Sequence, residues 1–438
     1  MSTGSATASM AVGTKTIQKL RFRILPFVLL LFVVALIDRN NVSFAALTMN
    51  KELGITSQQF GLIFGIFYFG YFIFEIPSNL LLHKVGARVW IARILISWGI
   101  VATLSGVVHT AHQLYIVRFL LGLAEAGYFP GIVLYLTYWF PRREQARAFA
   151  LLIMATPVTI IVGAPISGLI LDHVHWLGFS SWRWLLILEG LPAIVLGGLT
   201  YFLLPSRPDE VQFLTPHEKE WIKAELSREE QQKLGEGHYS VLQVLASRRV
   251  WHLVLVYFGM MVGLHTFTSW APQLVKSLSS MYSNSVIGLL LIMPSVTGLA
   301  AMICVSHSSD RRLERRYHVA LPALAAAVAL CLLRTASSPL LSMALLCLLA
   351  AGVYSYAAPF WALPNEFLTG YSAAAGIALI NSVGNLGGLL GPAVVGFFAQ
   401  RFGKVTEGLA FISVPLLLAA VLVLLLPPRR VISHMNTG

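Results

Sequence analysis

Long apolar runs, separated by short polar segments, dominate the sequence. Most runs have about 17 to 25 residues, the length that an α-helix needs to cross a bilayer. They predict twelve membrane-spanning helices, at residues 24–47, 59–82, 89–108, 113–137, 147–171, 183–204, 250–274, 285–306, 318–335, 339–362, 371–397 and 405–427. The pattern therefore predicts an all-α integral membrane protein.

A more polar segment divides the twelve runs into two groups of six. It contains eight of the nineteen acidic residues of the chain. Within it, Thr215-Pro216-His217-Glu218 combines a helix N-cap, a proline at the first helical position and a glutamate that can close a capping box. We expect a short amphipathic helix to follow. The predicted divisions are a tail at 1–23, a bundle at 24–204, a linker loop at 205–249, a second bundle at 250–427 and a tail at 428–438.

Basic residues gather at alternate ends of the predicted helices. The clusters are Lys15, Lys19, Arg21 and Arg23; Lys84 and Arg88; Arg142, Arg143 and Arg147; Arg311, Arg312, Arg315 and Arg316; and Arg429 and Arg430. Lys and Arg mark cytoplasmic loops, so both termini are expected to be cytoplasmic. The net charge of +12 then reflects topology and attraction to anionic lipid, and nucleic-acid binding is not expected.

Composition supports the membrane class and argues against several others. Hydrophobic residues make up 57% of the chain and charged residues 11%, against roughly 25% charged in soluble domains. The three cysteines fall within or beside predicted helices, so neither a disulfide nor a thiolate metal site is expected. No nucleotide-binding glycine loop, zinc-ligand spacing or nucleophile elbow occurs. We expect no enzyme activity, no cofactor and no metal.

Two pairs of ionisable residues interrupt the apolar runs. Asp38 and Arg39 lie in the first predicted helix, and Arg118 and Glu125 in the fourth. An ion at the membrane centre costs about 2.5–3.5 kcal/mol even on insertion scales. Arg118 and Glu125 are separated by two helical turns, roughly 10.5 Å, on one face. Each therefore needs a partner from another helix or from a substrate.

These residue types together suit coupled transport of an anion and a proton. Arginine presents a planar fork that matches a carboxylate. Desolvation favours a protonated carboxyl, whereas a nearby arginine favours the ionised form. An anion that competes for the arginine would release the acid to accept a proton. The alternative is structural: each arginine neutralises a buried acid and stabilises the bundle, or Glu125 is only a hydrogen-bonded acid.

The two halves share a glycine pattern. The segments Gly163–Gly168 and Gly391–Gly396 occupy corresponding helices and have the same glycine spacing. Glycines at such spacing let helices approach closely. The repetition indicates two related six-helix units, with hinge or packing roles for these glycines.

Four segments resemble sequences of the major facilitator superfamily. Within that superfamily, they are most similar to the anion:cation symporter group, which includes tartrate, hexuronate, aldonate, phthalate and hydroxyphenylacetate permeases. The four segments are Asp38–Ser43, Phe74–Asn79, Arg118–Gly127 and Gly376–Gly388. The resemblance implies the major facilitator fold, alternating access, a bacterial-type inner membrane and function as a monomer.

The resemblance also implies roles for individual residues. Positions that match substrate-binding residues of these permeases are Arg39, Tyr71, Arg118, Trp361, Asn381 and Asn385, and those that match proton-coupling residues are Asp38 and Glu125. The gating motif retains Lys84, Gly86 and Arg88 but has Asn79 and His83 in place of its first glycine and its acid. We therefore expect the copy at Asp310 and Arg311 to contribute more to the latch.

Other residues give weaker indications of function. Glu75 suits a gate or packing role, and His265 is interpreted as packing because the sequence shows no partner for it. Leu36, Thr156 and Ala358 replace polar residues that bind hydroxyl groups in aldonate permeases. Fewer polar partners favour a smaller or more apolar acid.

The sequence thus predicts a secondary active transporter. It is expected to import a small organic carboxylate, such as the hydroxy-dicarboxylate tartrate or an aromatic or sugar acid, by proton symport through alternating access. The alternatives are a proton-coupled exporter of organic anions or drugs, sodium coupling, and a sensor that binds an anion without transporting it.

Overall fold

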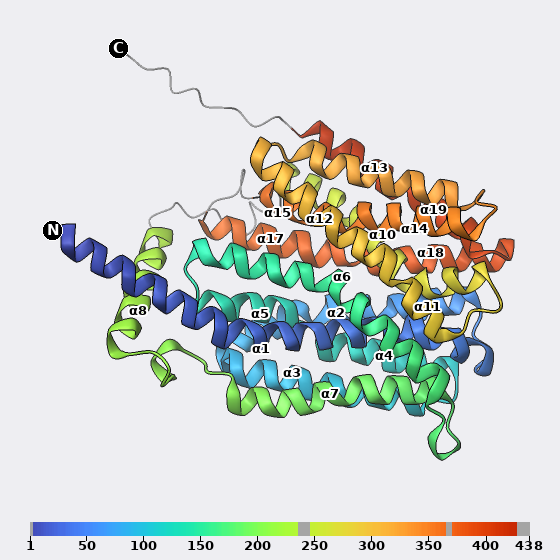
Figure 1. Ribbon diagram of the computed structural model, residues 1–438, viewed down its shortest axis with the longest axis horizontal. Coiled ribbons are helices and arrows are strands. Elements are labelled where there is room, and N and C mark those ends of the chain that lie inside the picture. Colours follow the sequence, from blue (N-terminus) through green and yellow to red (C-terminus); the bar gives the residue numbers. More distant parts are fainter. Residues whose placement is uncertain (1–2, 235–245, 365–369, 427–438) are drawn as a thin grey trace, which may run out of the picture.

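The computed structural model describes residues 3–234, 246–364 and 370–426, and this part of the chain is helical throughout its regular structure. Twelve helical segments in it are long and apolar enough to cross a membrane, and each matches one predicted span. Figure 1 shows the N-terminal half, blue to green, beside the C-terminal half, yellow to red. The predicted all-α fold with twelve membrane helices is confirmed.

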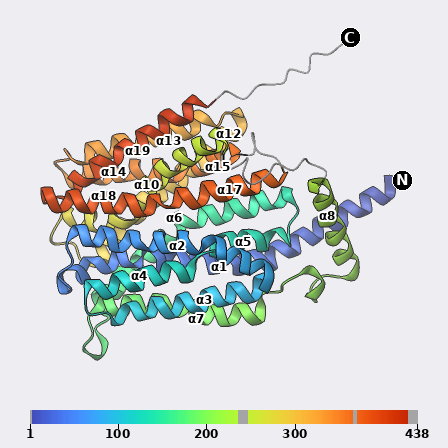
Figure 2. The same cartoon turned by 180° about the vertical axis from the view of Figure 1, so that it is seen from behind.

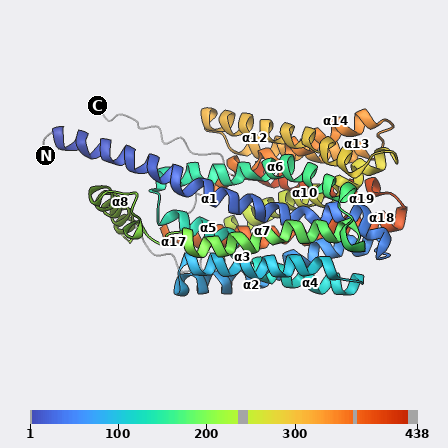
Figure 3. The same cartoon turned by 60° about the horizontal axis from the view of Figure 1, so that its bottom comes forward.

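The N-terminal half contains the first six spans and is followed by the linker helix α8. Its helices are α1 (Thr3–Glu52), α2 (Ser57–Val85), α3 (Ala87–Leu104), α4 (Ala111–Glu125), α5 (Tyr128–Thr137), α6 (Arg142–His173) and α7 (Ser181–Leu203), and the linker helix is α8 (Pro216–Leu234). The C-terminal half has α10 (Arg248–Leu278), α11 (Asn284–Leu290), α12 (Ile292–Arg312), α13 (Arg316–Leu333), α14 (Pro339–Ser355), α15 (Ala357–Ala362), α17 (Gly370–Asn385), α18 (Gly387–Phe402) and α19 (Val405–Leu425). In Figure 3, α1, α6 and α10 lie between the outer helices of the two halves.

The fourth span is broken near its middle. The fourth span consists of α4 and α5, which meet at Ala126-Gly127. Gly127 has a φ of +81°, in the left-handed region that favours glycine, and a Cβ there would collide with Ser78. The break ends α4 at Glu125, so this carboxyl lies at a helix end inside the membrane.

The first helix is longer than predicted. The predicted run at 24–47 is part of a longer helix, because α1 extends from Thr3 to Glu52 and so includes most of the predicted tail at 1–23. Its early turns extend beyond the bundle and contact α8, as Figure 2 shows. Lys19 Nζ lies 2.8 Å from Glu218 Oε2, and the ring of Trp221 packs against Gly13. These contacts with α8 stabilise the N-terminal extension of α1, because α8 covers one face of it.

The predicted capping box at the start of α8 is confirmed. Thr215 N donates to Glu218 Oε2 at 2.8 Å, and Glu218 N donates to Thr215 Oγ1 at 3.3 Å. Burial by itself would raise the pKa of the Glu218 carboxyl, but the hydrogen bonds from Lys19 and Thr215 hold that pKa below its ordinary value. The linker helix is thus fixed to α1 by an ionised carboxylate.

The two halves pack closely at the end of the bundle opposite α8, which we call the far side. Gly61 on α2 lies against the carbonyl of Pro392 on α18, and Gly168 on α6 lies against the backbone of Asn284 on α11. Gly396 lies in the same way against Ser57. Gly168 and Gly396 are the last glycines of the two repeated segments, so their predicted packing role is confirmed. Their close approach closes the far side.

A carboxylate strengthens this closure. Asp172, near the end of α6, accepts hydrogen bonds from the first turn of α11 in the other half. Asp172 Oδ2 lies 2.7 Å from Ser285 N, and Oδ1 lies 2.8 Å from Asn284 Nδ2. A negative charge at a helix N-terminus is favourable, so Asp172 acts as a cap supplied by the opposite half.

Candidate substrate site

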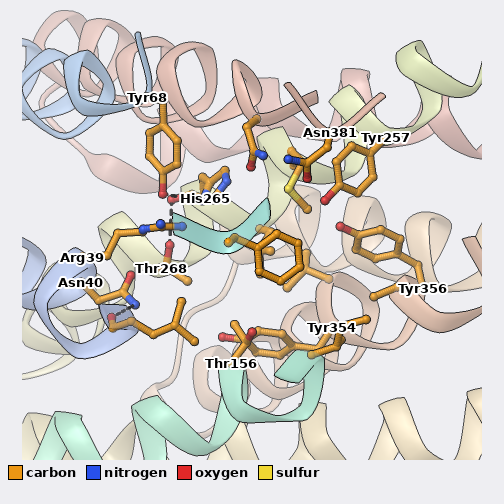
Figure 4. A pocket seen from close by; sticks show the side chains of 18 of the residues that line it. Arg39, Asn40, Tyr68, Thr156, Tyr257, His265, Thr268, Tyr354, Tyr356 and Asn381 are labelled. Carbon is orange, nitrogen blue, oxygen red and sulfur yellow. Dashed lines mark hydrogen bonds between the residues drawn. The ribbon is translucent and has the colours of Figure 1, made fainter. Parts of the chain in front are cut away.

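A cavity of about 170 Å³ lies between the halves near the middle of the bundle. Figure 4 shows its polar side chains converging from both halves. Among the residues predicted to bind substrate, five line it: Arg39, Tyr71, Trp361, Asn381 and Asn385. Arg118 is not among its lining residues, so the predicted pair of arginine clamps does not form one continuous wall in this conformation.

Arg39 is the predicted clamp that faces the cavity. Its Nη2 forms an ion pair with Glu125 Oε1 of α4. The guanidinium also lies over the rings of Phe67 and Tyr71, with centroid distances of 5.4 and 5.5 Å. The guanidinium is therefore held by the ion pair and by cation–π contacts with the two rings.

Arg118 lies deeper in the N-terminal half. Only 2% of its surface is exposed, and its guanidinium stacks over Phe67 at 5.1 Å. Its Nε and Nη2 have no hydrogen-bond partner within the described residues. Glu125 pairs with Arg39 and not with Arg118, in agreement with the two-turn spacing in α4. The site therefore contains a buried cation with unused donors directly behind the cavity wall.

The two predicted proton-coupling carboxyls have different surroundings. Glu125 is fully buried, and its Oε2 has no partner in the part of the chain that is described. Asp38, 1% exposed, instead accepts from neutral donors: Trp98 Nε1 at 2.6 Å and Asn41 Nδ2 at 2.9 Å. Glu125 is thus tied to the cavity through Arg39, whereas Asp38 is held within the N-terminal half.

A hydrogen bond across the cavity was not anticipated. Tyr68 Oη on α2 and His265 Nδ1 on α10 are 2.8 Å apart and join the two halves. His265 Nε2 is buried with no partner among the described residues, and the ring lines the cavity. The interpretation of His265 as packing alone was therefore incomplete. Its partner is 197 residues away in the sequence, and the sequence gives no signal for the pair.

Glu75 connects the halves on the side of α8. Its carboxylate accepts from Asn381 Nδ2 at 3.1 Å and from Ser382 Oγ at 2.7 Å, both on α17. Asn381 therefore lines the cavity while it is held by Glu75. This contact matches the gate interpretation of Glu75.

Of the three substitutions that favoured a less hydroxylated substrate, two lie at the cavity. Leu36 and Thr156 line the cavity, and Ala358 is not among its lining residues. Leu36 and the neighbouring Phe32 make one wall apolar. Hydroxyl-rich ligands would have fewer partners on that wall.

The predicted gating residues lie at the ends of helices. Gly86, with a φ of +94°, joins α2 to α3, and Lys84 beside it is exposed. Arg88 Nη1 lies 3.9 Å from Glu210 Oε2 of the linker. Asp310 Oδ1 pairs with Arg315 Nη1 of its own half at 2.6 Å, and Arg311 is exposed. In this conformation these contacts do not bridge the halves, and the gating role stays a prediction.

Comparisons with known proteins agree with this architecture. The sequence profile of the Major Facilitator Superfamily matches residues 28–392 and 281–436. A protein named "Putative tartrate transporter" from Agrobacterium vitis is 43% identical over 412 residues, which cover 94% of this chain and 91% of the relative. A "Quinolone resistance transporter" from Acinetobacter baumannii is 37% identical over 406 residues, 93% of each chain.

The fold is also seen in solved structures. A bacterial homologue of the human lysosomal transporter Spinster, in an inward-facing and occupied conformation, superposes with a TM-score of 0.73. The match covers 92% of this chain and 96% of that one at 14% sequence identity, which is informative about the fold alone. The twelve spans, the family and the bacterial relatives place the chain in the inner membrane as a multi-pass protein, as predicted. From its sequence, its helices and its relatives, this chain belongs to the Major Facilitator Superfamily of transporters.

Proposed function

We propose that this transporter imports a small organic carboxylate together with one or more protons. The observation that carries the proposal is the ion pair between Arg39, on the cavity wall, and the buried Glu125. The cation that an anionic substrate would meet first is the cation that neutralises this acid.

The ion pair supplies a coupling mechanism. A substrate carboxylate that enters the cavity competes with Glu125 for the Arg39 guanidinium, because both bind the same planar fork. Glu125, buried and deprived of its cation, then favours its protonated form. Proton and anion load together, since each removes the obstacle to the other. Arg118, with two unused nitrogens behind the wall, adds a second attraction for the anion.

The dimensions of the cavity support a small substrate. Its volume of about 170 Å³ is below the roughly 300–1,000 Å³ of pockets for drug-sized ligands. The tyrosines, His265 and Asn385 offer hydrogen bonds to a few hydroxyl or carboxylate oxygens. Relatives named for tartrate support a hydroxy-dicarboxylate of this kind.

The contacts between the halves support alternating access. The far side is closed by glycine-lined helix contacts and by Asp172, whereas the α8 side shows the contact of Glu75 with α17. The basic clusters within the described residues lie on the α8 side, which we assign to the cytoplasm, and the cluster at Arg429 and Arg430 lies outside the described residues. Rocking of the two halves would open each side in turn around the cavity.

A second function has one supporting observation. The relative named as a quinolone resistance transporter favours export of a drug or organic anion. The cavity volume favours the small carboxylate, and the direction of transport is open to measurement.

The test is uptake of radiolabelled carboxylates into proteoliposomes with an imposed inward proton gradient. We would compare the parent chain with Glu125→Gln and Arg118→Ala, and use Glu220→Gln on α8 and Arg93→Ala on α3 as matched controls. The expected result is gradient-driven accumulation in the parent and both controls. Glu125→Gln should abolish accumulation but retain exchange of the same anion, and Arg118→Ala should weaken both.

Other outcomes would overturn the proposal. Accumulation that persists in Glu125→Gln contradicts coupling through this acid. Binding of an acid without transport by the parent would support a sensor, and accumulation driven only by an outward gradient would support an exporter.

A further inference from the structure

His265 has a ring nitrogen without a partner at the wall of the cavity, and the coupling mechanism above does not use it. Its Nδ1 lies 2.8 Å from Tyr68 Oη, and its Nε2 is buried with no partner among the described residues. A buried donor or acceptor that stays unpaired is costly. His265 is 8% exposed and lines the cavity, so a ligand held there is suited to be the missing partner.

The ring of His265 is held in place by its neighbours. The centroids of the Tyr68 and His265 rings are 4.2 Å apart. Tyr68 in turn packs closely on Gly388 of α18, where a Cβ would lie 2.6 Å from the tyrosine ring. Turning the imidazole to bring Nε2 to Tyr68 would only exchange one unpaired nitrogen for the other. One ring nitrogen therefore stays available in either orientation.

Arg39 and His265 lie at the same depth in the two halves. Arg39 is thirteen residues before the end of α1, and His265 is thirteen residues before the end of α10. Both helices end beside far-side contacts, α1 before Ser57 and α10 before Asn284. At 1.5 Å per residue, both side chains start about 20 Å from the far side. Arg39 is also close enough for its charge to act on the imidazole, so one small ligand can contact both residues.

The other polar groups near these two residues are occupied. Asn40 Nδ2 donates to a backbone carbonyl of α1 at 2.8 Å, and Thr268 Oγ1 donates to a backbone carbonyl of α10 at 3.3 Å. Among the described residues that line the cavity, the buried polar atoms without a partner are Arg39 Nε, His265 Nε2 and Tyr354 Oη. Figure 4 shows Arg39 and His265 next to each other and Tyr354 on another part of the wall. The first two therefore form one polar subsite.

We propose that His265 binds the hydroxyl next to the carboxylate that Arg39 holds, so that the substrate is an α-hydroxy acid. This inference rests on the proposed function and names the chemical class of its substrate. A hydroxyl suits either tautomer of the ring, because it can accept from a protonated Nε2 or donate to a bare one. The carboxylate and the α-hydroxyl are carried by adjacent carbons, which matches the closeness of Arg39 and His265.

Two competing explanations give His265 no contact with the substrate. In the first, it only bonds to Tyr68 and joins the halves. In the second, Asn385, which lies close to the ring although Nε2 has no hydrogen bond in this conformation, is its partner. Under either explanation, removing the imidazole would weaken the binding of all acids to a similar extent. Under the proposal, it would weaken chiefly the binding of acids that carry the hydroxyl.

Two variants separate these roles. His265→Asn places its amide where Nδ1 lies, so it can keep the bond to Tyr68 but has no group at the position of Nε2. His265→Gln places its amide near the position of Nε2 instead. The control is His112→Asn at the exposed start of α4, which makes the same substitution away from the cavity.

The experiment measures the dissociation constants of tartrate and succinate for the full chain in detergent, by isothermal titration calorimetry. The two acids have the same carbon chain and the same two carboxylates, and succinate lacks the hydroxyls. The ratio of the two constants within one variant does not depend on the fraction of protein that is folded. A partly damaged variant therefore still reports on the hydroxyl.

We expect the parent to bind tartrate about tenfold or more tighter than succinate, because succinate leaves Nε2 unpaired. The ratio should fall to near one in His265→Asn, remain well above one in His265→Gln and keep its parent value in His112→Asn. An unchanged ratio in His265→Asn, or the reverse order of the two His265 variants, overturns the inference. A parent that does not bind tartrate also overturns it, whichever acid is taken up in the uptake test above. Uptake of no carboxylate in that test overturns the proposed function as well, so the two failures are distinguishable.

Discussion

Arg39 on α1 and Glu125 on α4 form an ion pair across the N-terminal bundle, although 86 residues separate them in the sequence. Arg39 is exposed to the cavity over 18% of its side chain, and Glu125 is not exposed at all. The pair therefore joins the cavity that we propose as the substrate site to a carboxyl that is fully buried. In the proposed mechanism, this relationship converts anion binding into a change at a buried carboxyl.

Replacing Arg39 by lysine should weaken substrate binding. Lysine keeps the charge but cannot form the planar fork or the same stacking on Phe67 and Tyr71. Loss of one charge-assisted hydrogen bond is worth about 1.5–3 kcal/mol, or roughly ten- to hundredfold in affinity. Binding of the labelled acid to purified Arg39→Lys measures this, with Arg93→Lys as the control. Parent-like affinity in Arg39→Lys would show that the fork is not used.

Adding a methyl group at Gly61 should prevent closure of the far side. A Cβ there would collide with the carbonyl of Pro392, so α2 and α18 would have to separate. We expect faster labelling of a cysteine introduced at Thr268 by an impermeant maleimide from the far side, and slower transport. Gly198→Ala is the control, because nothing lies within 4 Å of a Cβ at Gly198. Equal labelling of the two variants would contradict this closure.

Removing the charge of Asp172 should loosen the same side. Asp172→Asn keeps the shape but loses the anion at the start of α11, a contact worth about 0.3–1 kcal/mol or more when partly buried. The same cysteine at Thr268 should be labelled several times faster from the far side. The exposed variant Asp209→Asn in the linker should leave the labelling rate unchanged. A slower rate in Asp172→Asn would show that the contact favours the open far side.

The contact between α8 and α1 should depend on pH. The pKa of Glu218 is lower in the folded protein than its ordinary value, so the contact is fully stabilised near neutral pH and is lost as the pH falls through the folded pKa. Distances between spin labels at Gln18 and Ala224, measured in a cysteine-free background, should broaden at acidic pH. Glu218→Gln should show the broad distribution at neutral pH as well, and Glu220→Gln should not. A distribution independent of pH would contradict the role of this carboxylate.

The helices were predictable because the bilayer requires each spanning helix to have its own apolar run in the sequence. Every backbone polar group in a membrane must be bonded within its own helix, so each span needs a continuous apolar run. Runs such as 59–82 and 405–427 therefore match α2 and α19 closely. The same argument could not place the start of α1, because its early turns are polar and depend on contact with α8.

For the candidate site, the sequence could predict which charged residues take part but not how they pair. Ionisable residues in apolar runs identified Arg39, Glu125 and Asp38, because their cost in a membrane marks them without any structure. The sequence also showed, from the spacing in α4, that Arg118 and Glu125 could not pair. It could not show which helix supplied each partner, since that depends on how neighbouring helices are rotated and packed.

Local composition was enough to predict the membrane class, the twelve spans, the division into halves and the set of buried charges. Four contacts became known only from the packed helices: Glu125 binds Arg39, Arg118 lies behind the cavity wall, Tyr68 is hydrogen-bonded to His265, and Asp172 caps α11. Each of these is a contact between distant segments, and its energy is available only after the helices have packed against one another.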